Sequence, residues 1–187
     1  MENKRFKEPL INPTEEEMFT REPLMAFSFY LSGRNNVLLS LSDEIIDNLD
    51  KGLAGPIIKG DFVDRASTLL WLWTLGAYEV IRTISQATES FSDPFIGTVN
   101  DLKKRLAIVR MPNAKMEEQG KKEPVNSNRS PDGWDVPNKD LLVGSPENPI
   151  SGRLLLSIYQ RTISALTLKD VKKHHQESYK PKPNNTG

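Results

Sequence analysis

Two charged residues, Glu79 and Arg82, stand one helical turn apart in the most apolar stretch of the chain. Tyr78 precedes them and shares a helical face with Arg82, four positions later. An arginine on an apolar helix needs a carboxylate or carbonyl partner, because an unpaired buried charge is costly. We therefore expect either an internal ion pair that fixes the helix, or a polar pocket inside a helical bundle that all three residues line.

A second candidate site is the basic segment that follows. Its cations are Lys103, Lys104, Arg105, Arg110 and Lys115. They could form a solvated helix face. Alternatively, all of them except Arg105 could contact phosphates and bind RNA with an affinity that falls as salt rises. Arg110 and Lys115 would diverge on an ideal helix, and Pro112 between them could distort the helix and bring them together.

Other reactive residue types are scarce. The chain has no cysteine and two histidines, His174 and His175. Neighbouring positions on a helix point about 100° apart, so these histidines would not chelate one metal ion. The sequence contains no phosphate-binding loop, dinucleotide-binding glycine motif, zinc-protease motif or serine-hydrolase motif. We therefore assign no catalytic residue, metal ligand or cofactor, and we lean toward a protein that is not an enzyme.

Length and charge restrict the remaining classes. A chain of 187 residues favours one domain. Its 25 basic and 25 acidic residues balance, so no overall field attracts nucleic acid or an anionic membrane. The sequence shows no secretory signal and no apolar run of roughly 18 to 20 residues that could span a bilayer. We expect a soluble, cytoplasmic protein without membrane contact.

The apolar segment with the first candidate residues is predicted to form a central helix from about Phe62 to Ser85. It holds two of the three tryptophans, and its apolar residues extend around most of the helical wheel. Such a wheel is typical of a buried helix rather than a surface helix. We therefore expect the other helices to pack around this one.

Two more helices are predicted on either side of it. One begins in the apolar run 25–31, which could also be a strand, and ends at Gly52, a typical helix-ending residue. The other begins at the capping box formed by Thr98 and Asp101, and Pro112 should kink it or end its regular part. Its predicted core residues are Val99, Leu102, Leu106, Val109 and Met116.

A fourth main helix begins at Ser151, which can cap it. Its predicted core face consists of Leu154, Leu155, Ile158, Thr162, Ala165 and Leu166. A capping box at Thr167 and Asp170 predicts a short final helix over 168–178. A similar box at Thr14 and Glu17 predicts either a short helix or an arm that orders on a partner.

The segment from residue 120 to 150 is rich in proline and is predicted to be a long loop. Two apolar islands, 134–136 and 141–143, interrupt it, so it is functional, partly disordered or hides a short hairpin. The predicted fold is therefore all-α, a bundle of four main helices with a long irregular loop between the third and fourth. Around this single domain, residues 23–178, we expect a flexible arm at 1–22 and a disordered tail at 179–187.

The chain resembles the HEPN superfamily over about residues 35–166. The resemblance lies in the helix order, with Glu79 on the central helix and Arg110 on the next one. That family forms helical bundles, and its active members are metal-independent ribonucleases of prokaryotic toxin–antitoxin and defence systems. Their motif is an arginine followed, after four to six residues, by a histidine. Here Lys115 stands after four intervening residues, and a lysine, with an ordinary pKa of about 10, is a poor general base. The resemblance therefore implies an RNA-binding or ribonuclease-related member that does not cleave, or that has another task.

The sequence leaves three functions open. The first is a non-catalytic helical bundle that binds a protein partner or a second copy of itself. Apolar residues outside the central helix favour it, namely Phe27, Phe29, Tyr30 and Trp134. The alternative is a HEPN-like RNA-binding or ribonuclease-related protein of a prokaryotic defence or toxin–antitoxin system, active or inactive, which would use Arg110, Lys115 and Glu79. The third is a small-ligand pocket around Tyr78, Glu79 and Arg82.

Overall fold

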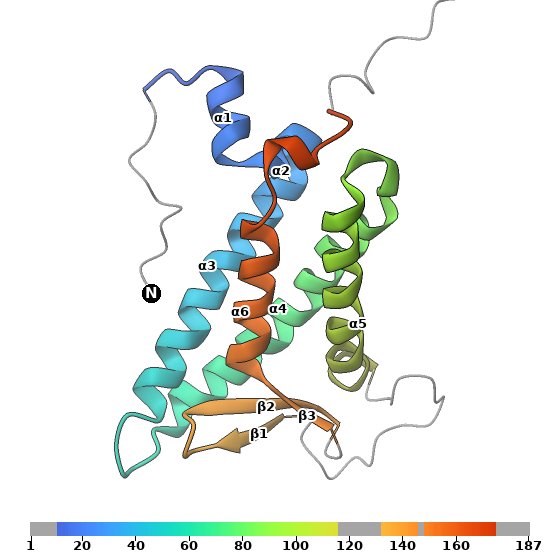
Figure 1. The fold of residues 1–187 in the computed structure, drawn as a ribbon. Helices are drawn as coiled ribbons and strands as arrows, with labels where there is room; N and C mark the ends of the chain where they lie inside the picture. The colour runs from blue at the N-terminus through green and yellow to red at the C-terminus, as the bar shows by residue number, and fades with distance from the viewer. Residues whose placement is uncertain (1–10, 116–131, 146–147, 175–187) are drawn as a thin grey trace, which may run out of the picture.

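Four long helices form an up-and-down bundle in the computed structural model, which describes residues 11–115, 132–145 and 148–174. They are α3 (Phe29–Gly52), α4 (Gly60–Gln86), α5 (Asp93–Lys115) and α6 (Gly152–Ser164). Consecutive helices run in opposite directions (Figure 1). The short helices α1 (Glu15–Arg21) and α2 (Pro23–Phe27) lie at one end of the bundle, and a small sheet lies at the other.

The described chain is mostly helical, as predicted, but part of the segment that was predicted to be an irregular loop forms a small sheet. Its strands are β1 (Asp132–Asp135), β2 (Asp140–Ser145) and β3 (Asn148–Ser151), which pair antiparallel in chain order. Leu141 and Val143 on β2 are buried, because β2 packs against α5 and α6. The apolar island at 141–143 therefore closes the end of the bundle, as the hidden-hairpin alternative implies.

A buried carboxylate joins the sheet to α6. Asp140 is only 4% exposed. Its Oδ1 accepts hydrogen bonds from the backbone N–H groups of Leu141 (2.7 Å) and Arg153 (3.0 Å). Its Oδ2 accepts the hydroxyl hydrogen of Ser151. Ser151 Oγ in turn accepts from the N–H of Leu154 at 3.0 Å, which confirms the predicted cap of α6.

Helix α5 begins earlier than predicted. It starts at Asp93, so Thr98 is an interior residue whose hydroxyl donates to the carbonyl of Pro94 (3.2 Å) instead of capping a helix. Proline is favoured in a first turn because the N–H that it lacks has no partner there. Pro112 lies inside the helix, which continues past it. The predicted core residues Val99, Leu102, Leu106 and Val109 are buried, and Met116 lies outside the described residues.

The N-terminal helices agree with the capping and helix-ending signals in the sequence, except that one predicted helix is divided in two. The capping box at Thr14 is formed and opens α1, where Phe19 is buried. The single helix predicted from the run 25–31 is instead divided at Ser28, which is extended and caps α3. Helix α3 ends at Gly52, as predicted, and a Cβ there would come within 2.7 Å of the Val63 side chain. Glycine is therefore needed at this position for the close approach of α4.

The final predicted helix, 168–178, is wrong over the residues that the structure describes after its first turn, and residues 175–178 lie outside the described part. Its capping box is formed, but it opens only a 3₁₀ turn, η2 (Leu168–Asp170). Val171 then pairs with Phe91 in an isolated β-bridge. Asp170 accepts a hydrogen bond from the Ser92 hydroxyl at 2.6 Å, and this bond is the main cause of the lowered pKa of Asp170. These contacts hold the segment after α6 against the turn between α4 and α5.

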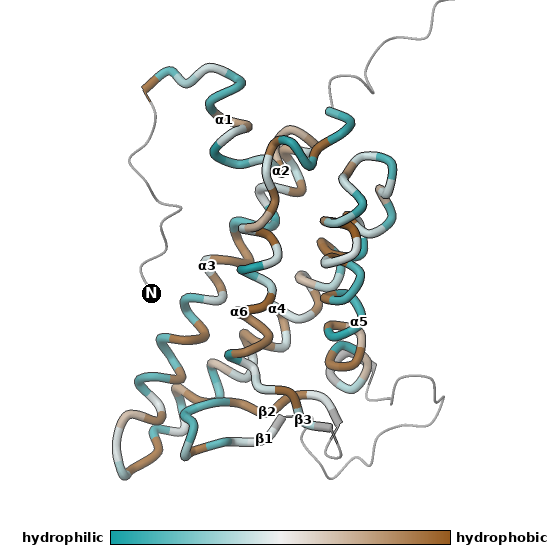
Figure 2. Tube along the Cα trace, viewed as in Figure 1, coloured by the Kyte–Doolittle hydropathy of each residue, from teal (hydrophilic) through white to brown (hydrophobic). Residues whose placement is uncertain are grey.

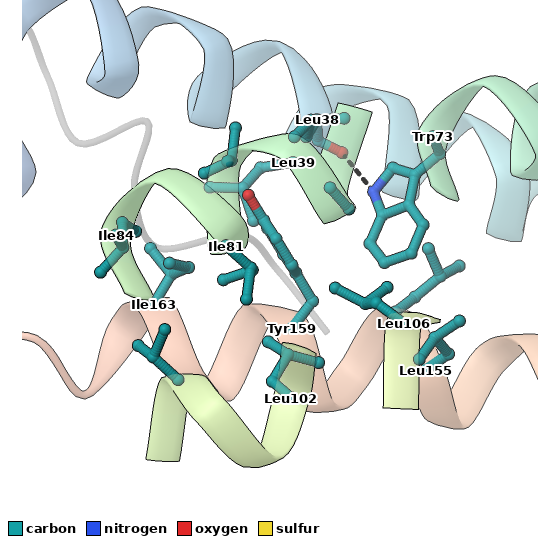
Figure 3. Packing of buried hydrophobic residues seen from close by; sticks show 14 of the residues in the cluster. Leu38, Leu39, Trp73, Ile81, Ile84, Leu102, Leu106, Leu155, Tyr159 and Ile163 are labelled. Atoms are coloured by element: carbon teal, nitrogen blue, oxygen red, sulfur yellow. Dashed lines mark hydrogen bonds between the residues drawn. The ribbon is translucent and has the colours of Figure 1, made fainter. Parts of the chain in front are cut away.

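The core lies between the four long helices, and α6 faces it with a side rotated from the predicted one. Tyr159 is fully buried, with its ring edge-on to Trp73 at 5.2 Å, whereas Leu154 is 47% exposed. The indole Nε1–H of Trp73 donates to the backbone oxygen of Leu38 (Figure 3). Figure 2 shows that apolar and hydrophilic residues alternate along these helices, as amphipathic packing requires.

Replacing Asp140 by alanine should lower the free energy of unfolding by about 3 kcal/mol, because buried donors would lose their acceptor. Asp140→Asn keeps one acceptor oxygen and should cost about 1 kcal/mol. Urea denaturation followed by circular dichroism measures both changes. The control Asp47→Ala removes an exposed helical ion pair with Lys51 and should change stability by less than about 0.5 kcal/mol. Equal effects of Asp140→Ala and the control would contradict the role of Asp140 as a buried cap.

Candidate functional site

Glu79 and Arg82 form the ion pair that their spacing predicts, but at the surface of the bundle. Arg82 Nη2 lies 2.7 Å from Glu79 Oε2, and the two side chains are 43% and 49% exposed. Arg82 also donates to Gln86 Oε1 at 3.3 Å. Exposed pairs of this kind contribute about 0 to 1 kcal/mol. The pair therefore lies outside the core, and Glu79 lines a groove between α3 and α4.

The structure brings Tyr78 and Arg110 together from two helices. The guanidinium carbon of Arg110 lies 4.6 Å from the centre of the Tyr78 ring, which is the geometry of a cation–π contact. Both side chains are half-buried where α4 meets α5. No carboxylate in the described part of the chain pairs with Arg110. The ring therefore positions an arginine whose hydrogen-bond donors remain open to an acceptor.

The other predicted cations are mostly engaged locally. Lys103 Nζ donates to Ser85 Oγ at 3.0 Å, and Lys104 pairs with Asp101 at 3.1 Å. Lys115 is the last residue of α5, and its side chain lies outside the description. The structure thus joins Arg110 to Tyr78 but does not show the predicted four-cation patch as one cluster.

The outer face of α4 carries apolar residues that were predicted to be buried. Trp71 is 43% exposed, Leu72 is 46% exposed, and Leu75 is half-buried beside them. We call these three residues the outer stripe. The inner face of α4 supplies the core residues Val63, Ala66, Leu70, Trp73, Ala77, Val80, Ile81 and Ile84. The apolar wheel of this helix therefore reflects two apolar faces, of which only one is inside the bundle.

A groove of about 500 Å³ between α3 and α4 adjoins the outer stripe, because Leu75 belongs to both. From α3 the groove is lined by Tyr30 and Val37, which are 70% and 64% exposed. The two helices approach closely at Gly76, where a Cβ would lie 2.9 Å from the Leu38 side chain. Val37 follows the helical spacing of core residues in the sequence but lies on the outer side of α3.

A larger cavity of about 850 Å³ lies on another part of the molecule, between α2, α3 and the end of α6. Its walls include Glu22, Leu24, Asn35 and Leu166. The sequence does not reveal this cavity, because segments far apart in the chain build it. The one indication of the cavity in the sequence is the polar residue Asn35, which stands between the apolar core positions Leu31 and Leu38.

The grouping of potential metal ligands and the hydropathy of the helices follow from the described residues. Within residues 11–115, 132–145 and 148–174, no group of three or more potential ligands from His, Asp and Glu comes together. The ring of His174 packs edge-on against Phe19 at 5.8 Å, and His175 lies outside the described residues. In the same described part, no helix has the length and apolar content needed to cross a membrane.

No protein-family model, curated protein or solved structure matches this chain. The resemblance to the HEPN superfamily therefore remains a prediction. Glu79 lies on α4 and Arg110 on α5, the helix order on which that prediction depends. The functional interpretation consequently rests on the geometry of this molecule.

Proposed function

We propose that the protein is a non-catalytic helical bundle that associates with a second copy of itself through the outer stripe of α4. The observation that supports this proposal is the exposure of Trp71 and Leu72, each by more than two fifths, side by side on one long helix. Large apolar side chains gathered on a surface are typical of protein interfaces, and tryptophan is enriched among the residues that dominate binding energy.

The charges at the two ends of the stripe favour a second copy as the partner. Asp64 and Arg82 are eighteen residues apart, or about five helical turns, so they lie on the same side of α4. The stripe lies between them. In an antiparallel pairing of two α4 helices about a two-fold axis, Asp64 of each copy faces Arg82 of the other. Trp71 of each copy then meets Leu75 of the other.

The apolar contacts and the ion pairs of this proposed interface have different energetic roles. Burial of the outer stripe supplies the affinity, and the groove beside it extends the apolar contact to Val37. The ion pairs at the rim add little affinity, but they fix orientation by disfavouring the parallel arrangement, which would place like charges together. The carboxylate of Asp64 forms no ion pair with any residue of the described ranges. It is therefore open to a partner.

Replacing Leu72 by glutamate should weaken self-association by at least about tenfold, because an unpaired carboxylate in a desolvated interface costs more than about 1.4 kcal/mol. Sedimentation velocity over a concentration series measures the change. Leu154→Glu is the matched control, since Leu154 is equally exposed, at 47%, but lies on α6. A wild-type protein that stays monomeric at the highest concentration, or equal effects of both variants, would contradict the proposal.

A second candidate function is RNA binding through Arg110, in line with the HEPN resemblance. The observation that favours it is that Tyr78 holds the Arg110 guanidinium near the surface without a described carboxylate partner. Such an arginine is suited to bind a phosphate group through its N–H donors. Because a lysine replaces the motif histidine, we expect binding without cleavage.

In this second candidate, Arg110→Ala should abolish retardation of single-stranded and structured RNA on a native gel at low salt. The same gel reports degradation, which should be absent. Arg65→Ala is the control, since Arg65 is an exposed α4 arginine that pairs with Glu44. Retardation that is equal in both variants, or absent from the wild type, would rule out RNA binding through Arg110.

A further inference from the structure

The cavity between α2, α3 and the end of α6 has the size and wall composition of a small-molecule site. Its volume of about 850 Å³ falls within the usual range of ligand pockets. The apolar part of its wall comes from Leu24, Ile163, Leu166 and Leu168. None of the outer-stripe residues lines it, so this site is separate from the proposed self-association surface.

Asn35 is a polar residue buried in this wall. The residue is 2% exposed, and its Oδ1 accepts the hydroxyl hydrogen of Tyr159 at 3.0 Å. Among the described residues, the Nδ2 of Asn35 has no acceptor. If the amide is turned over, the carbonyl oxygen becomes the atom without a partner. In either orientation the cavity wall holds one buried amide atom that a ligand can satisfy, and leaving it unsatisfied is costly.

A carboxylate, that of Glu22 before α2, lines the same cavity. Glu22 Oε2 accepts hydrogen bonds from the Ser32 hydroxyl at 2.9 Å and from Asn36 Nδ2 at 3.0 Å. The other oxygen, Oε1, has no partner within the described ranges. Ser32, Asn35 and Asn36 occupy one face of α3, because they are three and four residues apart. Glu22 is thus held against the face of α3 that carries Asn35, with one oxygen open.

We propose that this cavity binds a small organic amine that has an apolar body and an oxygen acceptor next to the amine. The ammonium group pairs with the open oxygen of Glu22, and the ligand oxygen accepts a hydrogen bond from Asn35 Nδ2. The branched apolar part packs against the leucine and isoleucine wall. Arg21 and Lys169 also line the cavity, so an anionic ligand is the competing outcome.

Four related small molecules separate the contributions of the amine, the oxygen acceptor and the apolar body. L-leucinamide carries the amine, the amide oxygen and a branched apolar body. 3-Methylbutylamine lacks the amide, 4-methylpentanamide lacks the amine, and 4-methylpentanoate replaces both with a carboxylate. Titration of the ¹⁵N-labelled full chain, followed by two-dimensional NMR, reports affinity and location together. L-leucinamide should give saturable shifts at Ser32, Asn35 and Leu166, and each truncated probe should bind about tenfold more weakly, as expected for one lost hydrogen bond to a charged or buried group.

The variant Glu22→Gln keeps the side-chain size and removes the charge. It should weaken L-leucinamide binding about tenfold and leave 4-methylpentanamide binding unchanged. Glu44→Gln on α3 is the control, since Glu44 pairs with Arg65 and does not line the cavity. The probe series on the wild-type protein tests the proposal even if a variant does not fold. No saturable binding, preference for 4-methylpentanoate, or equal affinity for the probe without an amine would overturn it.

Discussion

Helix α4 is apolar on two faces, and a four-helix bundle can bury only one of them. In this fold, neighbouring residues of α4 therefore differ in whether they are buried. Trp73 is fully buried, and its indole N–H donates to the Leu38 carbonyl, whereas Trp71 and Leu72 stay partly exposed. Because α3 and α5 pack along α4 and Tyr159 of α6 contacts Trp73 on its inner side, the outer stripe is only partly covered within the described part of the chain. The proposed self-association supplies the remaining cover.

Local signals in the sequence were enough to predict the four long helices. Helix periodicity, the end at Gly52 and the cap at Ser151 are encoded within a few residues and are present in the structure. The sheet could not be predicted in this way, because its strands are short and proline-flanked. It is held by the burial of Leu141 and Val143 and by the hydrogen bonds of Asp140, which depend on α5 and α6.

For the candidate site too, the sequence predicts contacts within one helix but not contacts that depend on how the helices pack. The Glu79–Arg82 pair follows from helical spacing, but its position at the surface does not, because a helical wheel with two apolar faces does not show which face is inside. The Tyr78–Arg110 contact depends on how α4 packs against α5. The pairing of Glu22 with Asn36 across fourteen positions depends on the fold of α2 onto α3 in the same way.

Antiparallel association through α4 is tested most directly by exchanging the two end charges. Asp64→Lys and Arg82→Glu should each weaken self-association, because each places like charges opposite one another at both ends of the stripe. The double variant should recover most of the wild-type affinity, since opposite charges again face each other. Sedimentation equilibrium of the four proteins measures this. A double variant that associates no better than either single variant would contradict the antiparallel pairing, and a monomeric wild type would contradict self-association itself.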